Sequence, residues 1–268
     1  MLPLRDRLPT RTTPFVTYAL IAANVIAFVW IRSLISVGYP AQALVLEWGL
    51  IPRRLFADPI DGGLTLFTSM FLHDPSGWLH LGGNMLFLWI FGDNVEDALG
   101  HVRYAAFYVL SGVAAAAAQV LIDPLSAVPM VGASGAISGV LAAYGSLYPR
   151  SPITVLNPIL PLWFIFGLFF ELPAWLVILE YFVVNLLNGL GSIGARGGGV
   201  AFFAHLGGFV AGLILIRFLM VGRAAREHER WKQWRPPPRR PRPPPDPWGD
   251  GGRGRRLGDP RRRGPWAS

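Results

Sequence analysis

Two polar side chains interrupt long apolar stretches of this sequence and form a pair that can do chemistry. Ser134 lies in the sequence GASG, and His205 lies in the sequence AHLGG. A polar or ionisable group at membrane depth is expensive and marks a functional site. A serine hydroxyl becomes a strong nucleophile when a histidine takes its proton. The pair therefore predicts a hydrolase that works inside the bilayer.

Glycines around both side chains would let their two helices approach closely. They are Gly132, Gly135, Gly139, Gly208 and Gly212. Small residues at three- and four-residue spacing allow membrane helices to pack with little separation. The same spacing is typical of ordinary helix packing, so the glycines favour contact between Ser134 and His205 without indicating catalysis by themselves.

A second pair, His80 and Asn84, offers hydrogen-bond donors one helical turn apart on one helix face. The tetrahedral intermediate of acyl transfer carries an oxyanion that such donors stabilise. The alternative is that the pair bridges two helices by hydrogen bonds. Within the predicted spans, Glu180 is the only carboxylate and lies midway along its span. This favours a Ser-His dyad over a triad with a carboxylate.

The elements that must position these residues are membrane helices. The chain has 52% hydrophobic and only 15% charged residues, with a mean hydropathy of +0.41, which exceeds what soluble domains carry. A helix of roughly 20 apolar residues crosses a bilayer. Six stretches qualify or nearly so, at Pro14–Ile31, Pro75–Gly92, Tyr104–Ile122, Pro124–Pro149, Leu172–Leu190 and Gly197–Ile216. We expect an all-α bundle of six transmembrane helices, with Ile153–Phe170 as an interfacial or re-entrant approach.

The distribution of basic residues predicts that both termini are cytoplasmic, because lysine and arginine near helix ends remain on that side. This orientation places Arg5, Arg7, Arg11, Arg103, Arg150 and the C-terminal tail inside, against Arg32, Arg53, Arg54 and Arg196 outside. Ser134 and His205 then both lie in the outer halves of their spans. The two side chains are therefore expected at similar depth.

The tail differs from the rest of the chain. We expect a cytoplasmic N-terminus at residues 1–13, a membrane domain at 14–221 and a disordered tail at 222–268. From residue 223 the tail holds 14 of the 24 basic residues and ten of the 24 prolines, a composition that favours extended, solvated chain. Anionic lipid headgroups are its expected partner, in preference to nucleic acid or a proline-motif domain. The chain has no cysteine, which excludes disulfides and thiolate metal sites.

These residues resemble the rhomboid intramembrane serine proteases. The matching motifs are G-x-S-G around Ser134, A-H-x-x-G-x-x-x-G from Ala204 to Gly212, and H-x-x-x-N from His80 to Asn84. Their order and six-helix setting also match over Pro14–Val221, and the sequences WLHLGGNM and FGDNVE are similar to those of bacterial members.

The resemblance implies a serine endopeptidase that cleaves transmembrane proteins in or near their spans, in the bacterial inner membrane. It implies Ser134 as nucleophile, His205 as general base and acid, and an oxyanion site of His80, Asn84 and the Ser134 amide. It requires no metal or organic cofactor. A substrate helix would enter between the second and fifth spans.

One departure from the family pattern, one further histidine and two rival functions stay open. Many rhomboid proteases have an aromatic residue one turn after the nucleophile, where this chain has Ser138, so another residue must orient the imidazole. His73 corresponds to a histidine before the second span, for which a structural or water-positioning role is expected. A non-catalytic rhomboid-like protein would normally lack the serine or the histidine. A transporter would use intramembrane carboxylates, and only Glu180 is available within the predicted spans.

Overall fold

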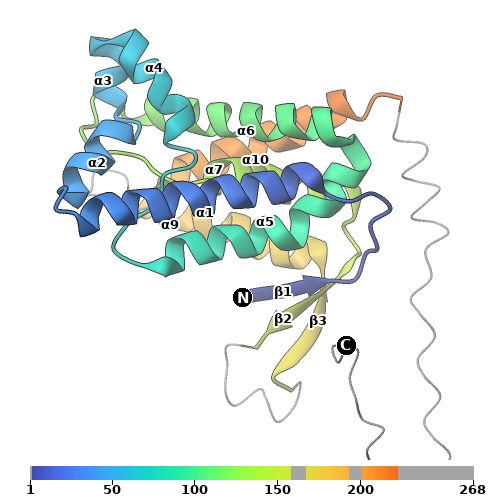
Figure 1. Cartoon of the computed structure of the whole chain (residues 1–268). Coiled ribbons are helices and arrows are strands. Elements are labelled where there is room, and N and C mark those ends of the chain that lie inside the picture. The colour runs from blue at the N-terminus through green and yellow to red at the C-terminus, as the bar shows by residue number, and fades with distance from the viewer. Residues whose placement is uncertain (1, 158–166, 193–200, 223–268) are drawn as a thin grey trace, which may run out of the picture. The chain divides into compact units, whose positions relative to one another are not determined.

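The protein is mainly helical in a computed structural model (Figure 1). The described residues are 2–157, 167–192 and 201–222. Six longer helices overlap the six predicted spans. They are α1 (Phe15–Ser36), α5 (Trp78–Leu99), α6 (His101–Ile122), α7 (Ser134–Leu147), α9 (Ala174–Ser192) and α10 (Phe202–Leu219).

Within this described part of the chain, four helices are long and apolar enough to cross a membrane, namely α1, α6, α9 and α10. Helix α5 has 22 residues but carries Asp93, Glu96 and Asp97 near its end. Helix α7 is apolar but has only 14 residues. It begins at Ser134, ten residues later than the apolar stretch from Pro124 suggested.

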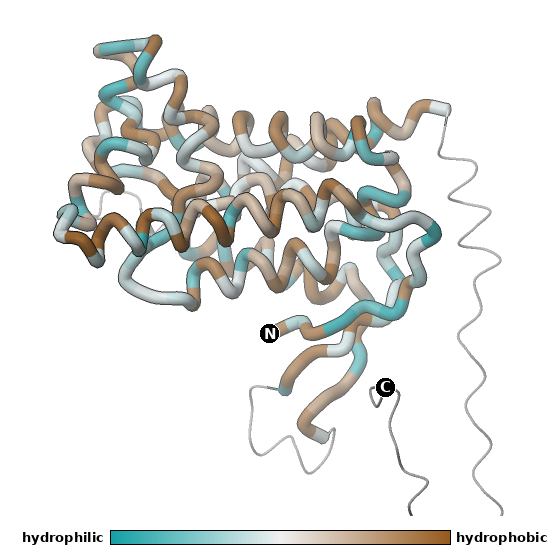
Figure 2. The backbone as a smooth tube through the Cα atoms, in the orientation of Figure 1, coloured by the Kyte–Doolittle hydropathy of each residue, from teal (hydrophilic) through white to brown (hydrophobic). Residues whose placement is uncertain are grey.

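The outer surface of these helices suits lipid. In α1 only four of 22 residues are buried, and large apolar side chains such as Ile26, Val29 and Trp30 are exposed. Most of the long helices are coloured as apolar in Figure 2, whereas β1 and the segment after it are largely polar. Exposed apolar surface of this extent marks contact with a membrane or a partner. The length and composition of the helices favour the membrane.

The prediction of an all-α chain is wrong in one respect, because three strands form an antiparallel sheet in the order β1-β2-β3. The strands are β1 (Leu2–Asp6), β2 (Pro152–Leu156) and β3 (Phe169–Pro173). Ile153 and Val155 are fully buried on one face of β2, with the two-residue period of a strand. The described ends of the segment Ile153–Phe170 are therefore strands, where we expected an interfacial or re-entrant approach. Residues 158–166 between them lie outside the described residues.

Asp6, the last residue of β1, ties the N-terminus to two helices. Its carboxylate accepts hydrogen bonds from Asn94 Nδ2 of α5 and from the Tyr144 hydroxyl of α7, both at 2.8 Å. Burial raises the pKa of Asp6 to about 6, because it outweighs the opposite effect of the Tyr144 hydrogen bond. The N-terminal segment is thus part of the fold at the end of α5 and α7.

The buried carboxylate of Glu96 fixes the start of α1 on α5. It accepts hydrogen bonds from the amides of Val16 (2.9 Å) and Thr17 (2.7 Å) and from the Thr17 hydroxyl (2.7 Å). The first-turn amides of a helix have no acceptor within the helix, and a negative charge there also suits the helix dipole. Asp97 accepts from the amide (3.1 Å) and hydroxyl (2.7 Å) of Thr12, which lies just before α1.

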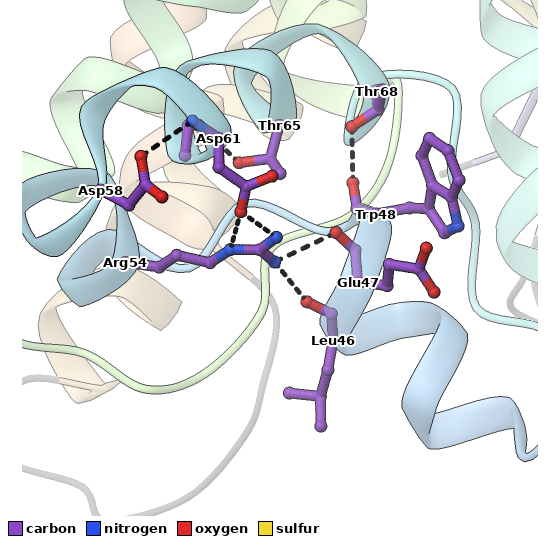
Figure 3. A network of polar contacts seen from close by, with 9 residues as sticks. Leu46, Glu47, Trp48, Arg54, Asp58, Asp61, Thr65 and Thr68 are labelled. Atoms are coloured by element: carbon purple, nitrogen blue, oxygen red, sulfur yellow. Dashed lines mark hydrogen bonds and ion pairs between the residues drawn. The ribbon is translucent and has the colours of Figure 1, made fainter.

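Three short helices fill the segment between α1 and α5, namely α2 (Ala41–Trp48), α3 (Pro52–Ala57) and α4 (Pro59–Thr68). Figure 3 shows Arg54 of α3 paired with Asp61 of α4 and donating to the α2 carbonyl oxygens of Leu46 (2.9 Å) and Glu47 (3.1 Å). The Thr68 hydroxyl donates to the Trp48 carbonyl at 2.7 Å. These bonds satisfy carbonyl groups at the end of α2 that the helix itself leaves open.

This short-helix segment is joined to the loop before Ser134. Leu50 and Met130 exchange both backbone hydrogen bonds, at 3.1 and 2.8 Å, and the Gly132 amide donates to the Ser69 carbonyl at 2.9 Å. The loop that leads into α7 is therefore held by backbone contacts from residues 60 to 80 positions earlier in the chain.

The expected disordered tail lies outside the described residues from residue 223 onwards, as do Arg196 and the rest of residues 193–200.

The raised pKa of Asp6 predicts a pH-dependent stability. The pKa is 3.8 in an unfolded chain and about 6 in the fold, so Asp6 favours the folded state below pH 4 and loses this contribution as the pH rises through 6. Asp6→Asn keeps an acceptor oxygen without the charge. We expect the variant in detergent to unfold a few degrees higher than the unsubstituted protein at pH 7.5 and at the same temperature at pH 4. Equal midpoints at pH 7.5 would contradict the role of burial.

Candidate active site

Ser134 and His205 are in contact. Ser134 is the first residue of α7, and His205 lies in the first turn of α10. The distance from Ser134 Oγ to His205 Nε2 is 2.7 Å, and both residues are half-buried. This is the hydrogen bond expected between a nucleophile and its general base.

The glycines of α7 and α10 lie where the two backbones approach most closely. An added Cβ at Gly212 would lie 2.5 Å from the carbonyl oxygen of Gly139, and one at Gly208 would overlap the carbonyl oxygen of Gly135. Toward α6, an added Cβ at Gly139 would lie 2.5 Å from Ser111 Oγ. Larger residues at these positions would separate α7 from its neighbours.

Gly132 lets a histidine ring lie against the backbone beside Ser134. Its φ of +124° is disfavoured for residues with a side chain, and an added Cβ would lie 3.0 Å from both Cε1 and Nε2 of His80. The same Cβ would lie 3.5 Å from Ser134 Oγ. The His80 ring and the Ser134 hydroxyl therefore both lie close to Gly132.

Asn84 and His80 each have a hydrogen-bond partner that determines which of their hydrogens they can still donate. The Asn84 amide nitrogen lies 3.0 Å from His73 Nε2, and Asn84 has a second amide hydrogen to offer. The Asp74 amide donates to His80 Nδ1 at 3.4 Å, which leaves the ring hydrogen on Nε2, the nitrogen near Gly132. His80 Nε2 can thus donate beside Gly132 and Ser134, and Asn84 keeps one amide hydrogen to donate.

His73 has a structural place next to this pair. It is fully buried, and its ring lies 5.0 Å from the His80 ring. Burial, followed by the nearness of His80, lowers the pKa of His73 to about 4. A neutral His73 can donate from Nδ1 to the Phe71 carbonyl at 3.3 Å and accept from Asn84 at Nε2. His73 therefore positions Asn84.

Helix α9 contributes two residues that the sequence reasoning missed. The Asn185 oxygen lies 2.5 Å from His205 Nδ1, and the Tyr181 hydroxyl lies 2.6 Å from Ser138 Oγ. The Tyr181 ring centroid is 6.3 Å from that of His205, at an angle of 35°. Tyr181 and Asn185 are four residues apart on one face of the predicted fifth span, a signal like that of His80 and Asn84.

Among the described residues, no group of three or more histidine, cysteine, aspartate or glutamate side chains is arranged to hold a metal ion. The site consists of hydroxyl, imidazole and amide groups. Such groups suit acyl transfer by a serine and a histidine.

The sequence profile of the Rhomboid domain matches residues 62–222. The chain belongs to the rhomboid family. This is a family of intramembrane proteases, and with its apolar helices this member is an integral membrane protein.

Relatives carry the same family name. The chain is 28% identical over 163 residues to the mitochondrial Rhomboid protein 1 of Saccharomyces cerevisiae, which covers 59% of this chain and 42% of the relative. It is 32% identical over 176 residues to RHOMBOID-like protein 5 of Arabidopsis thaliana, covering 66% of this chain and 50% of the relative. The chloroplastic Rhomboid-like protein 11 of Arabidopsis thaliana is 41% identical over 75 residues, 28% of this chain and 26% of the relative. The chain thus spans about half the length, or less, of the curated relatives it matches.

The packing of α7 on α10 predicts the effect of adding one methyl group. Gly208→Ala should push the two backbones apart and lower the free energy of unfolding by about 1–3 kcal/mol, measured as a fall in the thermal midpoint in detergent. Gly191→Ala on α9 is the matched control, because an added Cβ there meets nothing within 4 Å. Equal midpoints for both variants would show that the close approach is not required.

Proposed function

We propose that this rhomboid family member is a serine endopeptidase that cleaves transmembrane proteins in or near their spans through a Ser-His dyad. The observation that carries the proposal is the 2.7 Å contact between Ser134 Oγ and His205 Nε2. Membership of a family of intramembrane proteases supports it.

The dyad accounts for each bond and proton of the reaction. Ser134 Oγ attacks the carbonyl carbon of the substrate peptide bond as its proton passes to His205 Nε2. The C–N bond then breaks, and the imidazolium returns the proton to the leaving amine. A water molecule, deprotonated by the same Nε2, attacks the acyl-enzyme and releases the carboxylic acid product and the Ser134 hydroxyl. Acid and base roles thus alternate on one nitrogen.

The negative oxygen of the tetrahedral intermediate has three sources of stabilisation. Ser134 is the first residue of α7, where amides have no acceptor within the helix and the helix dipole is positive. His80 Nε2 and the second amide hydrogen of Asn84 are the side-chain donors. Donors fixed before the reaction stabilise developing charge without reorganisation.

We place the site within the membrane, below its outer surface. Helix α7 has 14 residues and is therefore about 21 Å long, whereas the hydrocarbon core is about 30 Å thick. If its C-terminal end reaches the cytoplasmic boundary, Ser134 lies about 9 Å short of the outer one. A polar site at this depth would meet the carbonyl groups of an unwound substrate helix.

The proposed setting is a bundle of six spans in a bacterial inner membrane, with both termini in the cytoplasm. The six helices α1, α5, α6, α7, α9 and α10 support the count. The arrangement of basic residues supports the orientation. In this orientation the basic tail would meet anionic headgroups, while transmembrane proteins are the substrates. The bacterial setting stays a prediction from the motifs, and the relatives described above include mitochondrial and plant proteins.

Replacement of the nucleophile tests the proposal directly. Ser134→Ala should abolish cleavage of a transmembrane substrate reconstituted with the full chain, and it should also abolish labelling by a serine-reactive phosphonate. The variant should still fold, with a thermal midpoint at most a few degrees lower, because it loses only the hydrogen bond to His205. Undiminished cleavage by the variant would sink the assignment. Labelling of the unsubstituted protein at Ser134 would separate a protease from a non-catalytic relative or a transporter.

Replacement of a donor tests the oxyanion site. Asn84→Ala should lower kcat roughly 10²–10³-fold with little change in KM, because the lost hydrogen bond forms to charge that develops in the transition state. Rates and thermal midpoints are to be measured on the same preparation. A variant that raises KM and leaves kcat intact would place Asn84 in substrate binding instead.

A further inference from the structure

Both ring nitrogens of His205 are engaged, and they face different helices. Nε2 lies 2.7 Å from Ser134 Oγ of α7, and Nδ1 lies 2.5 Å from the Asn185 oxygen of α9. A general base must present Nε2 without a hydrogen, so the hydrogen of the neutral ring has to sit on Nδ1. This tautomer is held only if an acceptor faces Nδ1.

The Asn185 amide is oriented so that its oxygen is that acceptor. Its nitrogen donates to the Tyr181 carbonyl, four residues earlier on α9, at 2.8 Å. The nitrogen of an amide is only a donor and its oxygen only an acceptor. With the nitrogen committed to Tyr181, the oxygen faces His205.

Helix α9 is held at the level of the site by a second bond on the same face. Ser138 Oγ donates to the Ser134 carbonyl at 2.7 Å and therefore accepts from the Tyr181 hydroxyl at 2.6 Å. This bond joins α9 to α7 one turn after the nucleophile. It sets the height of Asn185 relative to the dyad.

We propose that Asn185 is the positioning residue of the dyad, which holds His205 in the tautomer with hydrogen on Nδ1 and accepts from the imidazolium as it forms. The inference rests on the proposed function. Asn185 is 7% exposed, and a neutral amide costs far less than a carboxylate at such a place in a membrane. It supplies the orientation that an aromatic residue at position 138 would otherwise provide.

The titratable and polar groups around His205 determine how a substitution at position 185 would act on its ring. Among the residues that the structure describes, the titratable groups near it are His80 of α5 and Tyr181 of α9, and Glu180 precedes Tyr181 and is half-buried. Helix α7 faces it with the Ser134 hydroxyl. The Phe202 ring of α10 stands edge-on at 6.5 Å. A new charge at position 185 would thus act at the nitrogen opposite Ser134.

The test compares three variants of the full chain reconstituted with a transmembrane substrate. Asn185→Leu keeps the size and removes the acceptor, whereas Asn185→Asp keeps an acceptor and adds a charge. Asn188→Leu is the matched control, because Asn188 is exposed on the same helix. Rates are measured against pH, and kcat is separated from KM.

We expect Asn185→Leu to lower kcat about 10²-fold, within the range that a positioned general base contributes, with KM within twofold. Asn185→Asp should restore activity and move the acidic limb of the kcat profile to higher pH. The reason is that a carboxylate favours the imidazolium, so the base is lost at a higher pH. Asn188→Leu should behave as the unsubstituted protein.

An unchanged kcat and pH profile in Asn185→Leu would overturn the inference and leave the proposed protease intact. An unshifted acidic limb in a folded Asn185→Asp would overturn it too, even if Asn185→Leu fails to fold. Failure of the proposed function has a different signature, since the unsubstituted protein would then show no cleavage that depends on Ser134.

Discussion

The close approach of the α7 and α10 backbones is the constraint on which the site depends. Lipid tails provide no hydrophobic force that brings helices together, so packing contacts and hydrogen bonds between helices decide their separation. Here the carbonyl oxygens of Gly135 and Gly139 lie against Gly208 and Gly212, where a single methyl group would not fit. The hydrogen bond from the α7 hydroxyl to the α10 imidazole forms because the two helices begin side by side at this separation.

Hydrogen bonds between helices connect the polar groups of the site in pairs. Ser134 contacts His205, His205 contacts Asn185, and Ser138 contacts Tyr181. In a medium of low dielectric constant each pair is strong, and each unpaired group would be costly. The pairing also limits how the site can open. Under the proposed function, a substrate helix that entered between α5 and α9 would have to leave the bond between Asn185 and His205 in place.

Contacts remote from Ser134 and His205 hold the helices of these two residues at the level where they meet. Glu96 of α5 binds the first amides of α1, and Asp6 of β1 binds groups of α5 and α7. On the opposite side, the bridge between Leu50 and Met130 holds the loop that leads into α7. Long apolar helices can slide along one another in lipid, and polar contacts at both ends of the bundle oppose such sliding.

The sequence by itself determined the helical segments and one side of the site. Apolar length is a property of consecutive residues, and the spacing of His80 and Asn84 shows their common helix face without knowledge of any neighbour. Tertiary structure decided where α7 begins, the pairing of β1 with β2, the contact of His73 with Asn84 and the contact of Asn185 with His205. Apart from the start of α7, each of these is a contact between residues that lie from 11 to more than 100 positions apart in the sequence. Such contacts depend on the relative height and rotation of packed elements, which local composition does not encode.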